Sequence, residues 1–121
     1  MYIISKKFNF SASHVLNGLK DGHPCSFLHG HNYVATFCFR ADCLNEAGFV
    51  VDYKNLDCIK KFIDKTLDHR HLNDVLDFNP TAENIAKYLH QTFKPVFVEL
   101  YCVEVSETPS TNAAYEETER C

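Results

Sequence analysis

The sequence predicts an α+β domain in which a four-stranded antiparallel sheet carries two helices on one face. Toward both ends of the chain, apolar and polar residues alternate as they do in half-buried strands. Between these stretches lie two segments whose apolar residues recur at helical spacing. The resulting order is strand, strand, helix, helix, strand, strand. Runs of this kind, rather than strict alternation, are typical of α+β domains with antiparallel sheets.

The first two strands are predicted over residues 2–14 and 29–39. In the first strand, apolar residues at even positions share one face, and His14 ends the strand on that face. A loop with two glycines and a proline follows it. In the second strand, the odd positions form an aromatic face that begins with His29 and His31. We therefore expect three histidines to project from one face of the sheet.

Two helices are predicted in the middle of the chain. Asp52 is a suitable cap for the first, whose apolar stripe lies within residues 56–67. Thr81 is a suitable N-cap for the second, and Glu83 lies in the first turn, where the helix dipole favours negative charge. Pro95 ends this second helix.

The remaining strands are predicted over residues 96–107 and, more briefly, 112–117. The first of these stretches is rich in β-branched and aromatic residues. Four strands and two helices make a thin, two-layer domain whose sheet edges stay open unless another subunit pairs with them. The sequence therefore predicts a homo-oligomer.

Length and composition predict one globular domain over residues 1–121. Apolar residues make up 45% and charged residues 23%, and the net charge of -4 argues against generic binding to nucleic acid. A local cluster of lysine or arginine could still bind an anionic substrate. No apolar run is long enough to cross a bilayer, and the first ten residues carry charges where a signal peptide needs an apolar stretch. We expect a cytoplasmic protein without a membrane partner.

The six cysteines show no tight pairing motif, and in a reducing cytosol most of them are interpreted as buried or incidental thiols. They are Cys25, Cys38, Cys43, Cys58, Cys102 and Cys121. Cys25 differs from the others because histidines surround it in the sequence.

The histidines of the first two strands have the spacing of metal ligands. His29 and His31 are two residues apart on a strand, so both imidazoles project from the same face. His14 can supply a third nitrogen from the neighbouring strand. Three neutral imidazoles around Zn²⁺ leave one position open for water or substrate, which is typical of a catalytic site. Histidine pairs of this spacing also occur in strands without a metal, and spacing alone does not decide between the two interpretations.

A second interpretation makes Cys25 a fourth ligand, which would close the site and make the zinc structural. Asp68 and His69, which follow the first predicted helix, favour a catalytic site, because a carboxylate beside a histidine suits it to proton transfer. The alternative for this pair is a solvated helix end, where the dipole favours a histidine. Spacing decides neither whether the zinc is catalytic or structural, nor whether Asp68 and His69 transfer protons or lie at a solvated helix end.

Five motifs resemble the 6-pyruvoyltetrahydropterin synthase family, in the same order and over nearly the whole chain. They are FSASHVL, CSFLHGHNY, LDHRHLN, NPTAEN and SETPSTNAAY. The three-residue gap between Cys25 and the HGH motif resembles the bacterial 6-carboxytetrahydropterin synthase branch. The resemblance implies a tunnelling fold, in which trimers join their sheets into a barrel and two trimers stack into a hexamer.

The resemblance also implies a zinc site on His14, His29 and His31. The implied substrate is 7,8-dihydroneopterin triphosphate. The carboxy branch converts it to 6-carboxy-5,6,7,8-tetrahydropterin, acetaldehyde and triphosphate, on the route to queuosine. The alternatives are the pyruvoyl branch, which keeps the side chain, and a non-catalytic zinc-stabilised module. A metal-free pterin enzyme with the same fold, such as a dihydroneopterin aldolase, is a further alternative.

Further site residues are carried over from the same motifs. Cys25 is implied as the base, and His69, oriented by Asp68, as the group that moves a second proton. Glu107 is implied as the acceptor for the pterin edge; without the resemblance it reads as a solvated carboxylate at a strand end. Thr81 and Glu83 match positions that line the pterin pocket, although helix capping explains them equally well. Three other histidines match no functional position and are expected in loops or on the surface: His23, His71 and His90.

Overall fold

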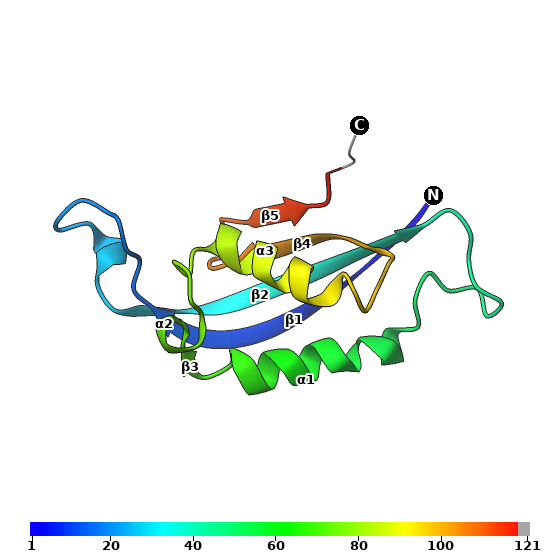
Figure 1. The fold of residues 1–121 in the computed structure, drawn as a ribbon, viewed down its shortest axis with the longest axis horizontal. Coiled ribbons are helices and arrows are strands. Elements are labelled where there is room, and N and C mark those ends of the chain that lie inside the picture. Colours follow the sequence, from blue (N-terminus) through cyan, green and yellow to red (C-terminus); the bar gives the residue numbers. More distant parts are fainter. Residues whose placement is uncertain (119–121) are drawn as a thin grey trace.

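The structure, a computed structural model, describes residues 1–118 and is built around two long strands that run along its length (Figure 1). These are β1 (Tyr2–His14) and β2 (His29–Ala41). Three shorter strands complete the sheet: β3 (Arg70–His71), β4 (Leu100–Ser106) and β5 (Ala113–Glu116). The predicted strands over 2–14, 29–39, 96–107 and 112–117 are thus confirmed, the third over a shorter range.

The sheet has the strand order β3-β1-β2-β4-β5 and is mixed, so the prediction of a four-stranded antiparallel sheet is wrong in two respects. The strand β3 was missed, and it pairs in parallel with β1 through Ala12 and Ser13. All other pairings are antiparallel. A strand of two residues is too short to show an alternation of apolar and polar residues. It forms because the chain after α1 is held against β1, where the His69 N–H donates to the Ser11 carbonyl at 2.6 Å.

The helices are α1 (Asp57–Thr66), the single-turn α2 (Leu72–Val75) and α3 (Ala82–Phe93). The Asp52 carboxylate caps the short 3₁₀ turn Tyr53–Leu56 rather than α1 itself, which begins at Asp57, directly after this turn. Thr81 caps α3 as predicted, since its Oγ1 accepts a hydrogen bond from the Asn84 N–H at 3.1 Å.

Both long helices pack on the same face of the sheet and form one hydrophobic core with it. Phe93 of α3 meets Phe37 of β2 with ring centroids 5.8 Å apart, and Phe62 of α1 meets Phe93 at 5.3 Å. Both contacts are edge-to-face, the geometry that the aromatic quadrupole favours. The core therefore fixes the even residues of β1 and the odd residues of β2 toward the helices.

The opposite face of the sheet carries polar side chains such as Ser11, Ser13 and Asn32, which are half-buried or exposed. We call it the helix-free face, because none of the helices described within residues 1–118 packs on it. None of those helices is long and apolar enough to span a membrane.

Candidate functional site

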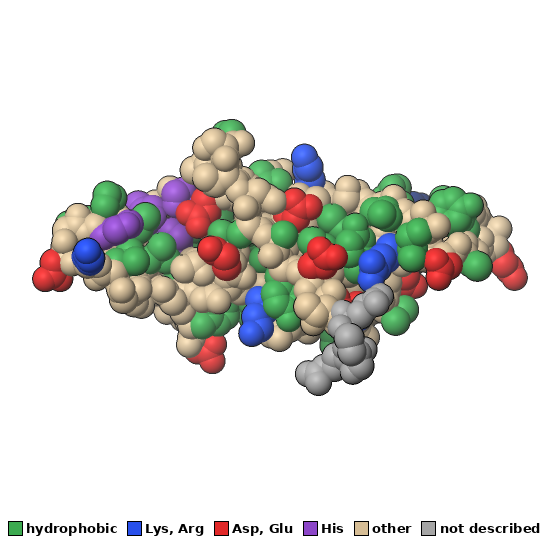
Figure 2. All heavy atoms as spheres, turned by 90° about the horizontal axis from the view of Figure 1, so that it is seen from above, with side chains coloured by type: hydrophobic (Ala, Val, Ile, Leu, Met, Phe, Trp, Pro, Cys, Tyr) green, Lys and Arg blue, Asp and Glu red, His purple; other side chains and the backbone are tan. Residues whose placement is uncertain are grey.

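Three histidines meet where β1 ends and β2 begins. His14 and His29 are direct partners in the β1–β2 ladder, and His31 lies two residues further along β2 on the same face. Their rings are 4.5 to 5.2 Å apart between centroids. Figure 2 shows histidine side chains gathered toward one end of the long molecule, beside acidic side chains.

Backbone carbonyls fix the tautomers of two of these histidines. The Nδ1 atoms of His14 and His29 lie 2.8 Å from the Pro80 carbonyl oxygen and 2.7 Å from the Phe27 carbonyl oxygen. Because a carbonyl oxygen only accepts hydrogen bonds, each Nδ1 must donate, and in the neutral rings both Nε2 atoms carry lone pairs. These two Nε2 atoms face each other at 2.9 Å. Two facing lone pairs suit a cation between them.

The third nitrogen is also available. The Nε2 of His31 is buried and lacks a hydrogen bond of acceptable geometry among the described residues, although the Glu107 Oε2 lies 3.0 Å from it. Burial lowers the pKa of His14, which keeps its imidazole in the neutral form that binds metals. One nitrogen from each of the three histidines falls within a 4.8 Å cluster. Three imidazole donors match the chemistry of zinc and related transition metals.

Cys25 lies beside this group rather than in it. It sits in the 3₁₀ turn Pro24–Ser26, half-buried, and its carbonyl accepts a hydrogen bond from the Leu16 N–H at 3.0 Å. Within residues 1–118, the ligand cluster at this place contains the three histidines without the Cys25 sulfur. His23, which the sequence assigned no function, caps the turn by accepting from the Cys25 N–H.

Asp68 and His69 form a pair that is fastened to the edge of β1. One carboxylate oxygen of Asp68 accepts from the Ser11 N–H at 2.8 Å, and the other lies 2.8 Å from Nδ1 of His69. The Ser11 hydrogen bond, followed by the contact with His69, lowers the pKa of Asp68. His69 has a φ of 58°, the left-handed region that a non-glycine residue rarely occupies. Its imidazole is 83% exposed, so it presents its free nitrogen to solvent.

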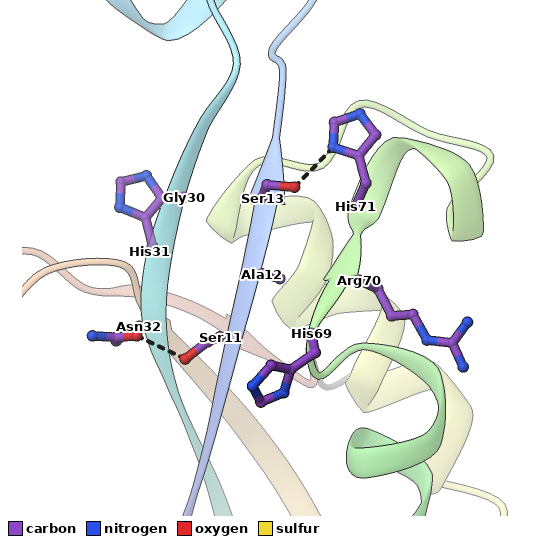
Figure 3. A pocket seen from close by; sticks show the side chains of 9 residues that line it. All are labelled: Ser11, Ala12, Ser13, Gly30, His31, Asn32, His69, Arg70 and His71. Carbon is purple, nitrogen blue, oxygen red and sulfur yellow. Dashed lines mark hydrogen bonds between the residues drawn. The ribbon is translucent and has the colours of Figure 1, made fainter.

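A pocket of about 480 Å³ opens beside His69 and contains polar residues that sequence reasoning missed (Figure 3). The Ser13 Oγ and the His71 Nδ1 are 3.0 Å apart in it, and the Ser11 Oγ donates to Asn32 at 2.7 Å. The prediction of a loop or surface position is wrong for His71, which belongs to β3 and lies against β1. It is also wrong for His90, which is buried in α3. The sequence does contain one indication that His71 lies near the site, because His71 belongs to the same LDHRHLN motif as Asp68 and His69.

The Asp68–His69 pair and the histidine cluster are linked through one pocket, which His31 and His69 both line. Ser11, Ser13 and Asn32 share the pocket with His69 and belong to the helix-free face. The side chains of His14, His29 and His31 belong, by strand alternation, to the face covered by the helices. The structure thus brings the metal-ligand candidates together and places His69 at a pocket that also reaches His31.

Glu107 connects the histidine cluster to a smaller pocket. Its side chain is 22% exposed and contacts His31, so it is not the fully solvated carboxylate of the alternative interpretation. Glu107 and Glu83 both line a pocket of about 200 Å³ between α3 and the turn before β5. Thr81 serves as the cap of α3.

The comparison with known proteins agrees with this arrangement. The family profile described as 6-pyruvoyl tetrahydropterin synthase matches residues 3–118. A Synechocystis protein named 6-carboxy-5,6,7,8-tetrahydropterin synthase is 34% identical over 122 residues, which cover 95% of this chain and 93% of the relative. A Bacillus subtilis protein of the same name is 30% identical over 128 residues, which cover 93% of this chain and 83% of the relative. The structure of Caenorhabditis elegans 6-pyruvoyl tetrahydropterin synthase superimposes with a TM-score of 0.85 at 29% identity, covering 97% of this chain and 96% of that one.

Proposed function

Since this chain belongs to the 6-pyruvoyl tetrahydropterin synthase family, we propose that it is a zinc-dependent lyase of the 6-carboxytetrahydropterin branch. It converts 7,8-dihydroneopterin triphosphate and one water molecule to 6-carboxy-5,6,7,8-tetrahydropterin, acetaldehyde and triphosphate, and so supplies the route to queuosine. The relatives from Synechocystis and Bacillus subtilis, both named for this activity, support the choice of branch.

The observation that carries the proposal is the facing pair of Nε2 atoms of His14 and His29, 2.9 Å apart with both Nδ1 atoms engaged by carbonyls. With His31 beside them, these residues would hold Zn²⁺ as three neutral imidazoles. Bound zinc supplies Lewis-acid polarisation of the side-chain hydroxyls of the substrate. The carbonyls of Pro80 and Phe27 keep the imidazoles oriented and their tautomers fixed.

Cys25 is the proposed base. Its turn is tied to the chain just after β1 through the Leu16 N–H, and this link supports a thiol placed near the end of β1, where His14 lies. A thiolate beside a cationic centre is favoured over the thiol, and it takes a proton from carbon in the side chain of the substrate. Its separation from the ligand cluster supports the role of base over that of a fourth ligand.

His69 is the proposed second proton carrier, and Asp68 holds it in one tautomer. Because Nδ1 of His69 faces the carboxylate, Nε2 is the nitrogen left to exchange a proton with the substrate. The pair opens onto the helix-free face, which supports a site completed by a second copy of the chain. The exposed edge strand β5 supports the same homo-oligomer, a trimer or hexamer. The chain would act as one domain over 1–121 in the cytoplasm.

Glu107 is proposed to bind the pterin ring, since a carboxylate can accept two hydrogen bonds from the ring N–H and the exocyclic amine. Its pocket is also lined by Glu83, and Thr81 caps α3, the helix that carries Glu83. These two are proposed to line the pterin pocket.

A second candidate is the pyruvoyl-forming activity, in which triphosphate leaves but the side chain is kept. The close superposition on the Caenorhabditis elegans enzyme favours it. The short spacing between Cys25 and the HGH motif favours the carboxy branch instead, because proton abstraction responds to displacements of about 1 Å.

Metal removal tests the proposal against a non-catalytic zinc-stabilised module. Chelation is expected to abolish turnover of 7,8-dihydroneopterin triphosphate, zinc to restore it, and the circular dichroism spectrum to stay the same. A chelated protein that unfolds would instead indicate a structural metal. A chelated protein that keeps full activity would contradict zinc dependence.

The assembled site has its own test. Mixing a Cys25→Ala chain with a His69→Ala chain, with subunit exchange, is expected to restore turnover that neither variant has alone. Mixed oligomers without activity would contradict a site shared between copies.

A further inference from the structure

Two cysteines and a glutamate meet on the helix-free face, in a place that the proposed reaction does not use. Cys38 of β2 and Cys102 of β4 are direct partners in the antiparallel ladder. Each is 7% exposed, although both lie on the face that the helices leave uncovered. Glu104 follows two residues after Cys102 and therefore points from the same face of β4.

The three side chains have the separations of ligands around one ion. The Cys38 Sγ lies 3.7 Å from the Glu104 Oε2, and ligand atoms of all three residues lie within 4.8 Å of one another. Zinc binds thiolate sulfur at about 2.3 Å and carboxylate oxygen at about 2.1 Å, so a tetrahedral site separates the two by about 3.6 Å. The observed separation of sulfur and oxygen matches this value.

Neighbouring residues hold the cluster in this arrangement. Asn112 donates to the other oxygen of Glu104, Oε1, at 2.7 Å, which turns Oε2 toward Cys38. The ladder shifts its register beside Cys38, because the partner of the next residue, Phe39, is Leu100 rather than Tyr101. Such irregularities re-aim side chains and are frequent beside functional sites.

We propose that Cys38, Cys102 and Glu104 form a second metal site, separate from the three histidines, for a thiophilic divalent cation such as Zn²⁺. Two thiolates and one carboxylate supply three ligands, and water completes the fourth position. On binding, each thiol loses its proton to solvent, so one cation replaces two protons. In the structure the Cys38 thiol donates a hydrogen bond to this carboxylate oxygen, and the cation would take the place of that proton.

The charges around the cluster are mixed. Glu116 lies directly across from Cys102 on β5 and adds negative charge. Arg40, two residues after Cys38, is stacked over the Tyr101 ring at 4.7 Å. This stacking gives the guanidinium a partner other than the cluster.

Cobalt substitution tests the proposal, because thiolate ligands give Co²⁺ an intense near-ultraviolet charge-transfer band that imidazoles do not. Reduced, metal-free protein is titrated with Co²⁺ alone. The wild type is expected to develop the band, and its final intensity is expected to correspond to one Co²⁺ bound by thiolates per chain. Cys38→Ser and Cys102→Ser are expected to lose it, and Glu104→Gln to raise the Kd by at least about tenfold. A matched control with serine at Cys25, Cys43, Cys58 and Cys121 is expected to keep the band.

Glu104→Gln retains both thiols and the shape of the side chain, so it decides the question if either serine variant fails to fold, as judged by circular dichroism. Three results would overturn the proposal: no thiolate band in the wild type, a band that survives loss of both Cys38 and Cys102, or a band that disappears in the four-serine control. The last result would assign the thiolate to the histidine site through Cys25.

Discussion

Replacing Asp68 by asparagine removes the charge from the pair with His69 while keeping the shape of the side chain. The amide oxygen can still accept from the Ser11 N–H, which is 2.8 Å away in the wild type. The amide nitrogen that then faces Nδ1 of His69 is a donor, so Nδ1 can no longer donate and the imidazole must adopt the other tautomer. The variant therefore tests orientation of His69 rather than anchoring of the loop.

The expected magnitude follows from the bond that is lost. A hydrogen bond between an imidazole and a carboxylate contributes about 1.5–3 kcal/mol, and if this contribution is realised in the transition state, kcat falls by about 10- to 100-fold. The wrong tautomer adds to this loss, because Nε2, the nitrogen proposed to exchange a proton with the substrate, then already carries a proton and cannot accept one. KM should change little, since the pair does not hold the pterin ring.

The assay is steady-state formation of pterin product from 7,8-dihydroneopterin triphosphate, with the metal content of each variant measured beside it. Asp64→Asn is the matched control: it removes a carboxylate near the end of α1 whose ion-pair partner among residues 1–118 is the exposed Lys60, and kcat should stay at the wild-type value. Wild-type kcat in Asp68→Asn, with zinc retained, would refute the reasoning and return the pair to a solvated helix end.

Three further predictions concern the base, the cap and the buried histidines. Cys25→Ala should keep its metal and its fold but lose about 10²- to 10⁴-fold in rate, as kinetics and metal analysis would show; loss of the metal would make Cys25 a ligand. Thr81→Ala should lower the free energy of unfolding in urea by about 1 kcal/mol, because the Asn84 N–H loses its acceptor; an unchanged midpoint would contradict this. Burial lowers the pKa values of His14 and His90 from 6.5, so the unfolded chain binds protons more readily than the folded one. The metal-free protein should therefore be most stable above that pH and lose stability as the pH falls below it, and a flat urea midpoint between about pH 7.5 and about pH 5.5 would contradict the argument.

Periodicity located the long elements because the core enforces it. The alternation of β1 and β2 reflects burial against α1 and α3, and Phe37 and Phe93 show both periods meeting in one contact. The strand β3 escaped prediction because it is two residues long and depends on contacts between His69 and Ser11, which are distant in the sequence. No local pattern encodes such a pairing.

The candidate site also contains residues that local pattern could predict and contacts that it could not. Spacing alone brought His14, His29 and His31 to one face, and the structure places their nitrogens in one cluster. The contact between Glu107 and His31 could not be foreseen, because it depends on where β4 ends relative to β2. Nor could the sequence place His31 and His69 at one pocket, since that depends on how the chain leaves α1.

The most direct test of the account is to incubate the zinc-loaded enzyme with 7,8-dihydroneopterin triphosphate and quantify acetaldehyde beside the pterin product by mass spectrometry. We predict acetaldehyde and 6-carboxytetrahydropterin in equal amounts, both lost on chelation and restored by zinc. A pyruvoyl product without acetaldehyde would contradict cleavage of the side chain, and turnover that survives complete removal of the metal would contradict the role proposed for His14, His29 and His31.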